Sequence, residues 1–494
     1  MKEFVTLNQQ NLELLKSRIN VPLYDRSKAN TGIVHIGIGG FHRSHQAYYC
    51  DELLNSGHDL NWGICGVALL DHDIKIYNTL KKQDGLYTLI VKELNGAWRI
   101  QVIGSITEVL FAPENTTAVI EKLANPKTKI ITLTITEGGY NYDESTGEFN
   151  MKNPLIQHDL SHPQNPKTVF GYLTQALKLR KERSISACTI QSCDNVQGNG
   201  EVMQKTLLAY MGDAEPDLVD WVKENVSFPS SMVDRITPVT EAADIEKLKQ
   251  DFKIEDDWPV TCEPFIQWVI EDEFADGRPS WEDVGAEFVK DVEPFEKMKL
   301  QLLNAGHSVV GILGALIGYN TIDESVNDPE LQLFLSDFMN NEVSPILDGL
   351  EGMDLKAYKK SLIARFGNQN IKDQVTRICS QTSAKLPKFL MPTIKKQLSK
   401  DGQIKLSSFV IATWAIYSLG VNENGETLTI TDEMEKEINE HALSAKEDAM
   451  SFLNLTAVFG DLKESEKFAH AFTEAYDAIS KHGVKEAIVT LKND

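Results

Sequence analysis

Apolar and β-branched residues recur in short runs through the first half of the chain, and helical patterns separate several of these runs. The runs predict strands at residues 33–37, 62–69, 129–136 and 185–192. Strands that alternate with helices are typical of a mostly parallel sheet covered by helices on both faces. The pattern therefore predicts an α/β fold for this half.

The pattern changes near Pro294, where strand signals fade and longer helical periodicities follow. These periodicities predict helices at residues 302–319, 329–350, 409–419 and 464–480. Glycine and proline punctuate the loop 274–291, which indicates a domain boundary there. We expect one domain at 1–290 and a mainly α-helical domain at 291–494.

Length and composition agree with two globular domains, and the length also allows a third. The 494 residues exceed one ordinary core, and 42% hydrophobic with 24% charged residues exclude a disordered or fibrous chain. Lys and Arg number 49 against 72 Asp and Glu, which gives a formal net charge of −23. Because this charge repels phosphate backbones and anionic lipid heads, neither nucleic acid nor a membrane is an expected partner.

No segment indicates secretion, a membrane span or a metal centre. The apolar run 309–319 is well below the roughly 20 residues that cross a bilayer. Residues 1–10 carry acidic and polar side chains rather than a signal sequence. The 6 cysteines are scattered, without a Cys-x-x-Cys pair or zinc spacing. We therefore expect a cytoplasmic protein with reduced, buried thiols and no bound metal.

The first candidate site is a glycine turn between a predicted strand and a predicted helix. The strand at 33–37 runs into Gly37-Ile38-Gly39-Gly40-Phe41-His42-Arg43. Glycines at such a turn let the backbone approach a pyrophosphate at the positive end of the helix. His42 occupies the third glycine position of the dinucleotide fingerprint, so a plain strand-to-helix turn is an alternative interpretation.

The second predicted strand ends shortly before Asp71 and Asp73. A carboxylate at this position can accept hydrogen bonds from an adenosine ribose and repel the extra phosphate of NADP. The distance from the glycines exceeds the usual spacing of about 20 residues. Exposed loop acids are therefore an equal alternative.

Two further strand ends carry polar groups where open parallel sheets bind ligands. Glu137 lies in Thr136-Glu-Gly-Gly-Tyr140, and Asn195 follows Ser192-Cys-Asp. The amide of Asn195 could lie beside a nicotinamide site. A turn-forming Asp-Asn pair explains the same residues without a ligand.

The helical segment that begins at Lys299 carries three polar residues among leucines and glycines. A pitch of 3.6 residues places Lys299 and His307 on one side of the helix, with Asn304 less than half a turn away. Burial would lower the pKa of Lys299 and make it a base for alcohol oxidation. A lysine that extends to solvent beside a core histidine is the alternative.

Arg365, Arg377 and Lys385 form a cationic segment in the helical half. They could bind a polyhydroxylated or acidic substrate. Taken by themselves, these residues favour the interpretation as a solvated charged surface.

These motifs together resemble the mannitol dehydrogenase family of polyol-specific long-chain dehydrogenases. The motifs are Gly37-x-Gly-Gly-Phe-His-Arg-x-His45, Thr136-Glu-Gly-Gly-Tyr140, Ser192-Cys-Asp-Asn195 and Lys299-x4-Asn304-x2-His307, supported by Met232-Val-Asp-Arg235 and Arg365-Phe-Gly-Asn368. The resemblance is spread along the chain, in order, from about residue 31 to beyond 390. One motif could arise by chance, but the whole series is specific.

The resemblance implies a fold and a reaction. It implies a Rossmann-type dinucleotide-binding N-terminal domain, a mainly helical substrate-binding domain, and NAD-dependent, metal-independent interconversion of a polyol such as D-mannitol and its 2-keto sugar, D-fructose. By matching position, Lys299 corresponds to the general base and His307 to a substrate-orienting group. Asn195 and Asn304 correspond to amides that stabilise the developing alkoxide.

The remaining matched positions concern binding. Asp234, Arg377 and Lys385 correspond to substrate contacts, and Asp73 corresponds to a position that favours NAD over NADP. The expected cofactor-binding set is Gly37, Gly39, Gly40, Phe41, His42, Asp73 and Glu137. The family suggests a monomer or a small homo-oligomer that acts on a small-molecule substrate.

Three other functions remain open from the sequence. Fructuronate and tagaturonate reductases belong to the same family and share the lysine motif. A phosphorylated polyol is a further possible substrate. A non-catalytic nucleotide-binding sensor is a different class, but it would be expected to lack at least one of Lys299, Asn195, Asn304 and His307.

Overall fold

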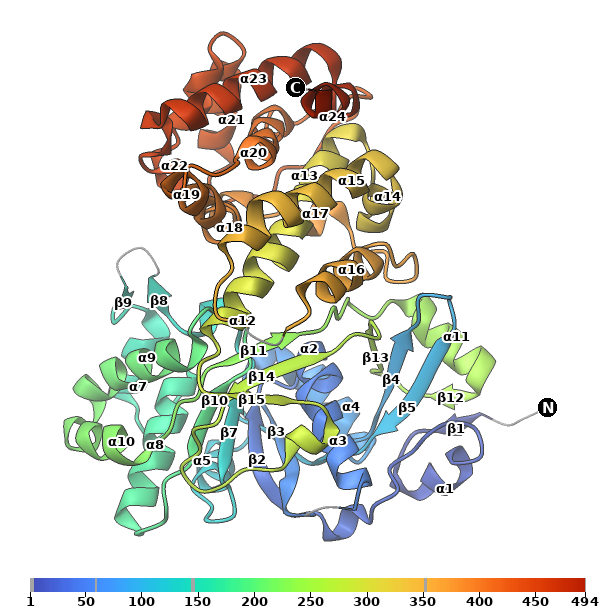
Figure 1. Ribbon diagram of the computed structural model, residues 1–494. Helices are drawn as coiled ribbons and strands as arrows, with labels where there is room; N and C mark the ends of the chain where they lie inside the picture. Colours follow the sequence, from blue (N-terminus) through green and yellow to red (C-terminus); the bar gives the residue numbers. More distant parts are fainter. Residues whose placement is uncertain (1–3, 58–59, 144–146, 351–352, 494) are drawn as a thin grey trace. The chain divides into compact units, whose positions relative to one another are not determined.

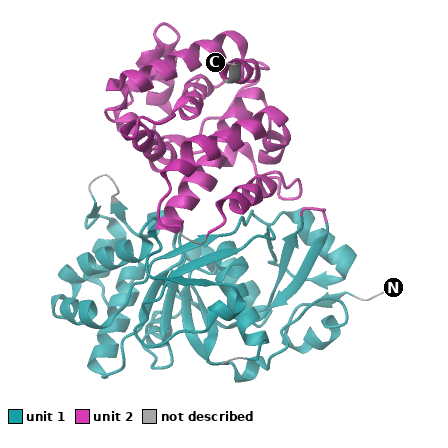
Figure 2. Cartoon of the chain, viewed as in Figure 1, with its two compact units in different colours: residues 1–93, 97–293 teal, residues 94–96, 294–494 magenta. Residues whose placement is uncertain are grey.

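The computed structural model describes residues 4–57, 60–143, 147–350 and 353–493 (Figure 1). Its backbone forms two compact units (Figure 2). Unit 1 comprises Met1–Glu93 with Ala97–Glu293, and unit 2 comprises Leu94–Gly96 with Pro294–Asp494. Unit 2 therefore contains the part of the chain in which the sequence pattern becomes helical.

Unit 1 is built around a parallel five-stranded sheet. The strand order is β10 (Thr189–Ser192), β7 (Ile130–Leu133), β2 (Thr31–Ile36), β3 (Gly63–Ala68) and β6 (Ile106–Phe111). Every neighbouring pair is parallel. The predicted α/β, Rossmann-type fold is confirmed, and β6 adds a strand that the sequence pattern does not reveal.

Alternate strand residues point to opposite faces of this sheet, and each face packs against its own hydrophobic core. Val34 and Ile36 join one core, and Ile33 and Ile64 join a second. Helices α5 (Thr116–Leu123), α8 (Val169–Glu182) and α9 (Asn199–Ala214) contribute to the first core, and α3 (Gln46–Asn55) and α4 (Ile74–Lys82) contribute to the second. Helices therefore cover both faces, as the alternation predicts.

Smaller sheets complete unit 1. The three-stranded sheets are β11 (Ser231–Asp234), β14 (Gln267–Glu271) and β15 (Glu287–Val289), and β13 (Val260–Cys262), β4 (Tyr87–Lys92) and β5 (Trp98–Ile103). The two-stranded sheets are β1 (Val5–Thr6) with β12 (Ile254–Glu255), and β8 (Tyr142–Asp143) with β9 (Glu148–Phe149). The loop 274–291 contains β15, which pairs with β14, so this loop belongs to unit 1.

Unit 2 is helical, and its described residues form no named strand. The buried helix α13 (Ala305–Ile317) packs against several of its neighbours. The other principal helices of unit 2 are α14 (Ile322–Asn327), α15 (Pro329–Asp337), α16 (Leu355–Phe366), α17 (Val375–Ile378), α18 (Thr382–Phe389), α19 (Met391–Ser399), α20 (Lys405–Tyr417), α21 (Glu435–Ala445), α23 (Glu466–His482) and α24 (Val484–Asn493). The predicted helical domain is confirmed.

The helical run Glu293–Ile317 is longer than the apolar run 309–319 noted in the sequence. By length and composition alone its 25 residues could cross a membrane. However, 78% of its most apolar window is buried inside the structure. The run therefore has the character of a core helix, whose apolar residues face neighbouring helices.

Candidate active site

The glycine turn lies between β2 and the short helix α2 (Gly40–Ser44). Gly37 has a φ of +103°, and a Cβ there would lie 2.0 Å from the carbonyl oxygen of Thr134. A Cβ on Gly39 would instead meet no atom within 4 Å. Gly37 is therefore required by its backbone conformation and by close packing against the chain after β7, whereas Gly39 borders open space that a ligand can approach.

His42 does not point toward that open space. Its ring is 1% exposed and stacks on His35, with 3.4 Å between ring centroids. The ring nitrogens of His35 pair with Thr132 Oγ1 at 2.7 Å and with the Gly37 carbonyl oxygen at 2.9 Å. Burial lowers the pKa of His35 to about 3 and that of His42 well below its usual value. Two neutral rings therefore support the turn from inside.

Asp73 and Glu137 lie after the carboxyl ends of strands that flank the glycine turn. Asp73 closes the short 3₁₀ helix Asp71–Asp73 after β3, where its Oδ2 accepts the Leu70 N–H at 3.0 Å. Glu137 is exposed in the one-turn helix α6 (Thr136–Gly139). The predicted strand at 129–136 is too long, because β7 ends at Leu133 and Thr136 has a φ of +61°.

Asn195 follows β10, and Asp234 ends β11, a strand of a different sheet. Asn195 is exposed just after β10, and Asp234 is the buried last residue of β11. The side chain of Asn199 bonds to the backbone N–H of Ser231 at 2.9 Å and to its carbonyl oxygen at 2.7 Å. Ser231 Oγ also donates to the Ser192 carbonyl oxygen at 2.7 Å. These contacts join the end of β10 and the loop after it to the first residue of β11, three residues before Asp234.

Asp194 joins this region to the turn after β7. Its carboxylate accepts the N–H of Ile135 at 3.0 Å, the N–H of Thr136 at 2.9 Å and the hydroxyl of Tyr140 at 2.8 Å. Burial raises the pKa of Asp194 to about 6, and the backbone N–H groups oppose that rise. Of Asp194 and Asn195, the sequence indicates a ligand contact only for Asn195, with a turn-forming Asp-Asn pair as the alternative. It does not predict these contacts of the Asp194 carboxylate.

The segment that carries Lys299 is a π-helical turn, η7 (Lys299–Asn304), between α12 (Glu293–Met298) and α13. The expected pitch of 3.6 residues therefore does not hold here. The Ala305 N–H bonds to the carbonyl oxygen of Leu300, five residues earlier, and this pattern makes residues five apart neighbours. Lys299 thus neighbours Asn304, and Asn304 neighbours His307 by ordinary helical spacing.

Lys299 and His307 are each 8% exposed. The His307 ring lies 4.0 Å from the Phe366 ring at the end of α16. A Cβ on Gly306 would approach Phe366 and Leu335 to 3.3 Å, so helix packing fixes the backbone beside His307. The three polar groups therefore occupy one side of a tightly packed helix.

Arg377 and Lys385 lie together on elements that pack against this helix. Arg377 is exposed and pairs with Asp373 through Nε–Oδ1 at 2.7 Å and Nη2–Oδ2 at 2.5 Å. Lys385 Nζ donates to the Ile378 carbonyl oxygen at 2.9 Å, and burial, followed by the charge of Arg377, lowers its pKa. Helix α17 packs against α13, and α18 packs against both α13 and η7.

The cysteines and the acidic groups form no metal centre in the described ranges of the chain, where no group of three or more His, Cys, Asp or Glu could hold an ion. All 6 cysteines are buried and unpaired. Burial raises the pKa of the Cys188 thiol. Burial raises the pKa of the other five thiols as well, which favours their protonated form near neutral pH.

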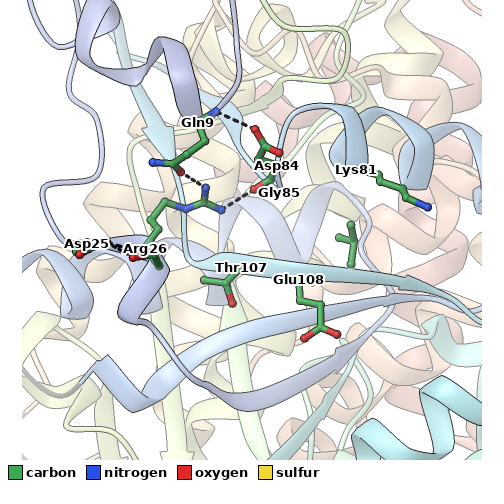
Figure 3. Close-up of a pocket in the computed structure, with 10 residues that line it drawn as sticks. Gln9, Asp25, Arg26, Lys81, Asp84, Gly85, Thr107 and Glu108 are labelled. Carbon is green, nitrogen blue, oxygen red and sulfur yellow. Dashed lines mark hydrogen bonds between the residues drawn. The ribbon is translucent and has the colours of Figure 1, made fainter.

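A separate pocket of about 430 Å³ lies beside β6, an edge strand of the main sheet (Figure 3). Arg26 donates to the carbonyl oxygens of Gly104, Asp84 and Ile106 and to Gln9 Oε1. Its guanidinium is thus engaged by the surrounding fold. None of the predicted site residues lines this pocket.

Two family models match the chain and together span most of it. The model described as mannitol dehydrogenase Rossmann domain matches residues 31–283, and the mannitol dehydrogenase C-terminal domain matches residues 291–480. The chain belongs to the mannitol dehydrogenase family. Both matches fall on the two units in the order that the sequence motifs predict.

Similar proteins of the mannitol dehydrogenase family cover nearly the whole chain. Mannitol 2-dehydrogenase of Aspergillus terreus is 41% identical over 493 residues, which is 98% of each chain. The solved Pseudomonas fluorescens mannitol 2-dehydrogenase, in a ternary complex with NAD and D-mannitol, is 43% identical with a TM-score of 0.88, covering 99% of this chain and 100% of that one. A solved D-sorbitol dehydrogenase in substrate-free form is 36% identical with a TM-score of 0.92, covering 98% and 100%.

Proposed function

We propose that the chain is an NAD-dependent dehydrogenase that interconverts D-mannitol and D-fructose. The observation that carries this proposal is the 43% identity, over nearly both full chains, to a mannitol 2-dehydrogenase solved with NAD and D-mannitol. Lys299, Asn304 and His307 on one packed helix supply the groups that such a reaction needs.

The residues of unit 1 fit the cofactor. Gly39 borders open space at the start of α2, so the backbone there can approach a pyrophosphate. We assign Gly37, Gly39, Gly40 and Phe41 to the cofactor turn, with His42 as its internal support. Asp73 after β3 would bind the adenosine ribose and disfavour NADP, and Glu137 after β7 would face the same ligand.

The bound nicotinamide supplies the hydride acceptor that alcohol oxidation needs. Lys299 Nζ takes the proton of the reacting hydroxyl. Removing this proton favours hydride loss, because negative charge on the oxygen helps the hydride to leave the carbon. Amide N–H groups of Asn195 and Asn304 donate to the oxygen as negative charge develops there, and His307 orients the hydroxyl. In ketose reduction, Lys299 returns the proton.

Substrate recognition is assigned to three further side chains. Asp234 at the end of β11 can accept hydrogen bonds from sugar hydroxyls, and Arg377 and Lys385 can donate to them. Lys385 Nζ donates hydrogen bonds to the backbone carbonyl oxygens of Arg377 and Ile378, which fixes the direction of its ammonium group. Oriented donors and acceptors of this kind bind a polyol without a metal ion.

The 36% identity and TM-score of 0.92 to a D-sorbitol dehydrogenase favour D-sorbitol as a second polyol to test. Initial rates with NADH should be compared for fructose and fructuronate, and then repeated with NADPH. Fast reduction of fructose with NADH supports the proposal. A preference for fructuronate would show that the substrates are sugar acids. Equal rates with NADH and NADPH would contradict the proposed role of Asp73 in disfavouring NADP.

A further inference from the structure

The turn after β7 and the loop after β10 are joined by one buried side chain. The carboxylate of Asp194 belongs to the second segment, but all three donors that it accepts lie in or beside the first, at Ile135, Thr136 and Tyr140. Asp194 is 8% exposed. Three donors on one buried carboxylate make this a firm link between the two segments.

The turn after β7 needs such support because its backbone is strained. Thr136 has a φ of +61°, a left-handed conformation that a β-branched residue rarely adopts. Asp194 accepts the N–H of Thr136 and the N–H before it, which stabilises this conformation directly. Glu137, the next residue, takes its position from Thr136.

The other end of the link carries Asn195. The backbone of Asp194 is fixed as well, because its carbonyl oxygen accepts Asn199 Nδ2 at 3.0 Å and its N–H donates to Ser192 Oγ at 3.2 Å. Asp194 is therefore held by its main chain in one segment and by its side chain in the other. A shift of either segment moves the other.

We propose that Asp194 is a positioning residue that sets Glu137 and Asn195 in one geometry, so that cofactor binding and alkoxide stabilisation depend on the same carboxylate. This inference rests on the proposed function, which gives Glu137 and Asn195 their separate roles. Misplacement of reacting groups by about 1 Å can lower a rate by about 10²-fold. A residue that touches neither ligand can therefore control both steps.

Asp194→Asn tests this link, because an amide is similar in size but presents an NH₂ group toward donors. Asp159 offers a matched control in the same unit. It is buried and accepts the N–H of Lys167 at 2.7 Å, the N–H of Thr168 at 2.8 Å and the Thr168 hydroxyl at 2.6 Å. Asp159→Asn thus removes the same kind of buried acceptor from a segment without proposed ligand contacts.

The measurements are kcat, the KM for NAD and the KM for D-mannitol of both variants, with the melting temperature of each. We expect both variants to melt earlier. Only Asp194→Asn should lower kcat, by about 10²-fold, and raise the KM for NAD several-fold together. Asn195→Ala should lower kcat without that change in KM, and Glu137→Gln should change the KM for NAD without that loss of kcat.

Unchanged kinetics in folded Asp194→Asn, or an equal kinetic loss in Asp159→Asn, would overturn the inference. If Asp194→Asn does not fold, Tyr140→Phe removes one donor to Asp194 and should give a smaller change in the same two parameters. Kinetics like those of the wild type in Tyr140→Phe would then overturn it. Turnover of D-mannitol by the wild-type protein tests the proposed function separately. If that turnover is absent, NADH binding to the same variants still tests whether Asp194 positions Glu137 for cofactor binding.

Discussion

Lys299 has the most specific chemical role in the proposed mechanism, since no other group is assigned the proton of the alcohol. Lys299→Ala should lower kcat for mannitol oxidation by about 10²- to 10⁴-fold, the usual contribution of a general base. Lys297→Ala is a matched control, because this lysine is exposed two residues earlier on α12. Steady-state kinetics of both variants measure the difference, and unchanged turnover in Lys299→Ala would remove the base from the mechanism.

The sequence alone predicts some of the candidate site residues but not the contacts that they make. The motifs identify Lys299, Asn195 and the glycine turn as candidates, because their residue types and order are specific. They do not reveal that His42 stacks on His35 or that Asp194 reaches the turn after β7. Both facts depend on which strands become neighbours, and one residue's identity does not specify its partner across a sheet.

The π-helical turn η7 is the feature of secondary structure on which the proposed mechanism depends most, because it carries Lys299. Deleting Gln301 would restore an ordinary helix and rotate Lys299 by about 100° relative to α13. We expect a folded protein with unchanged helical circular dichroism and little activity. Gln301→Ala keeps the chain length and should retain activity, so an active deletion variant would show that the π turn is not needed.

A second π-helical turn, η8 (Phe338–Val343), carries a buried carboxyl that caps α20. Glu342 accepts the N–H of Leu406 at 2.6 Å and the N–H of Ser407 at 2.9 Å. Burial raises the pKa of Glu342 to about 7, from 4.5. The folded protein therefore binds this proton more tightly than the unfolded chain does.

The contribution of Glu342 to the free energy of unfolding is fully present below pH 4.5 and is lost as the pH rises through about 7. Glu342→Gln cannot titrate, so its free energy of unfolding should not show this dependence on pH. Urea unfolding of both proteins below pH 4.5 and above pH 7 measures the difference. A stability difference between the two proteins that does not change with pH would contradict the assignment.

For helices and strands, the sequence predicts the type of element better than the residues at which it begins and ends. Strands β2 and β3 are found because apolar runs precede glycine or acidic turns, and α13 and α23 because their periodicity is long. The short strands β11, β14 and β15 are missed because few residues give little periodicity. The π turn is missed because its residues, Lys299 to Asn304, look the same in an α-helical pattern.

At the scale of the whole molecule, the proposed mechanism is metal-independent, because side-chain amides take the place of a Lewis acid in it. We expect prolonged EDTA treatment and gel filtration to leave mannitol oxidation intact. The measurement is the initial rate before and after treatment. Loss of activity that only zinc restores would refute this expectation.

The most direct test of the proposed function is the stoichiometry of D-mannitol oxidation by the whole chain with NAD. We predict that one NADH and one D-fructose form for each D-mannitol consumed, with NADP a poor substitute. No NADH formation from D-mannitol, together with rapid NADH consumption on fructuronate, would contradict the proposed function while leaving the fold and family unchanged.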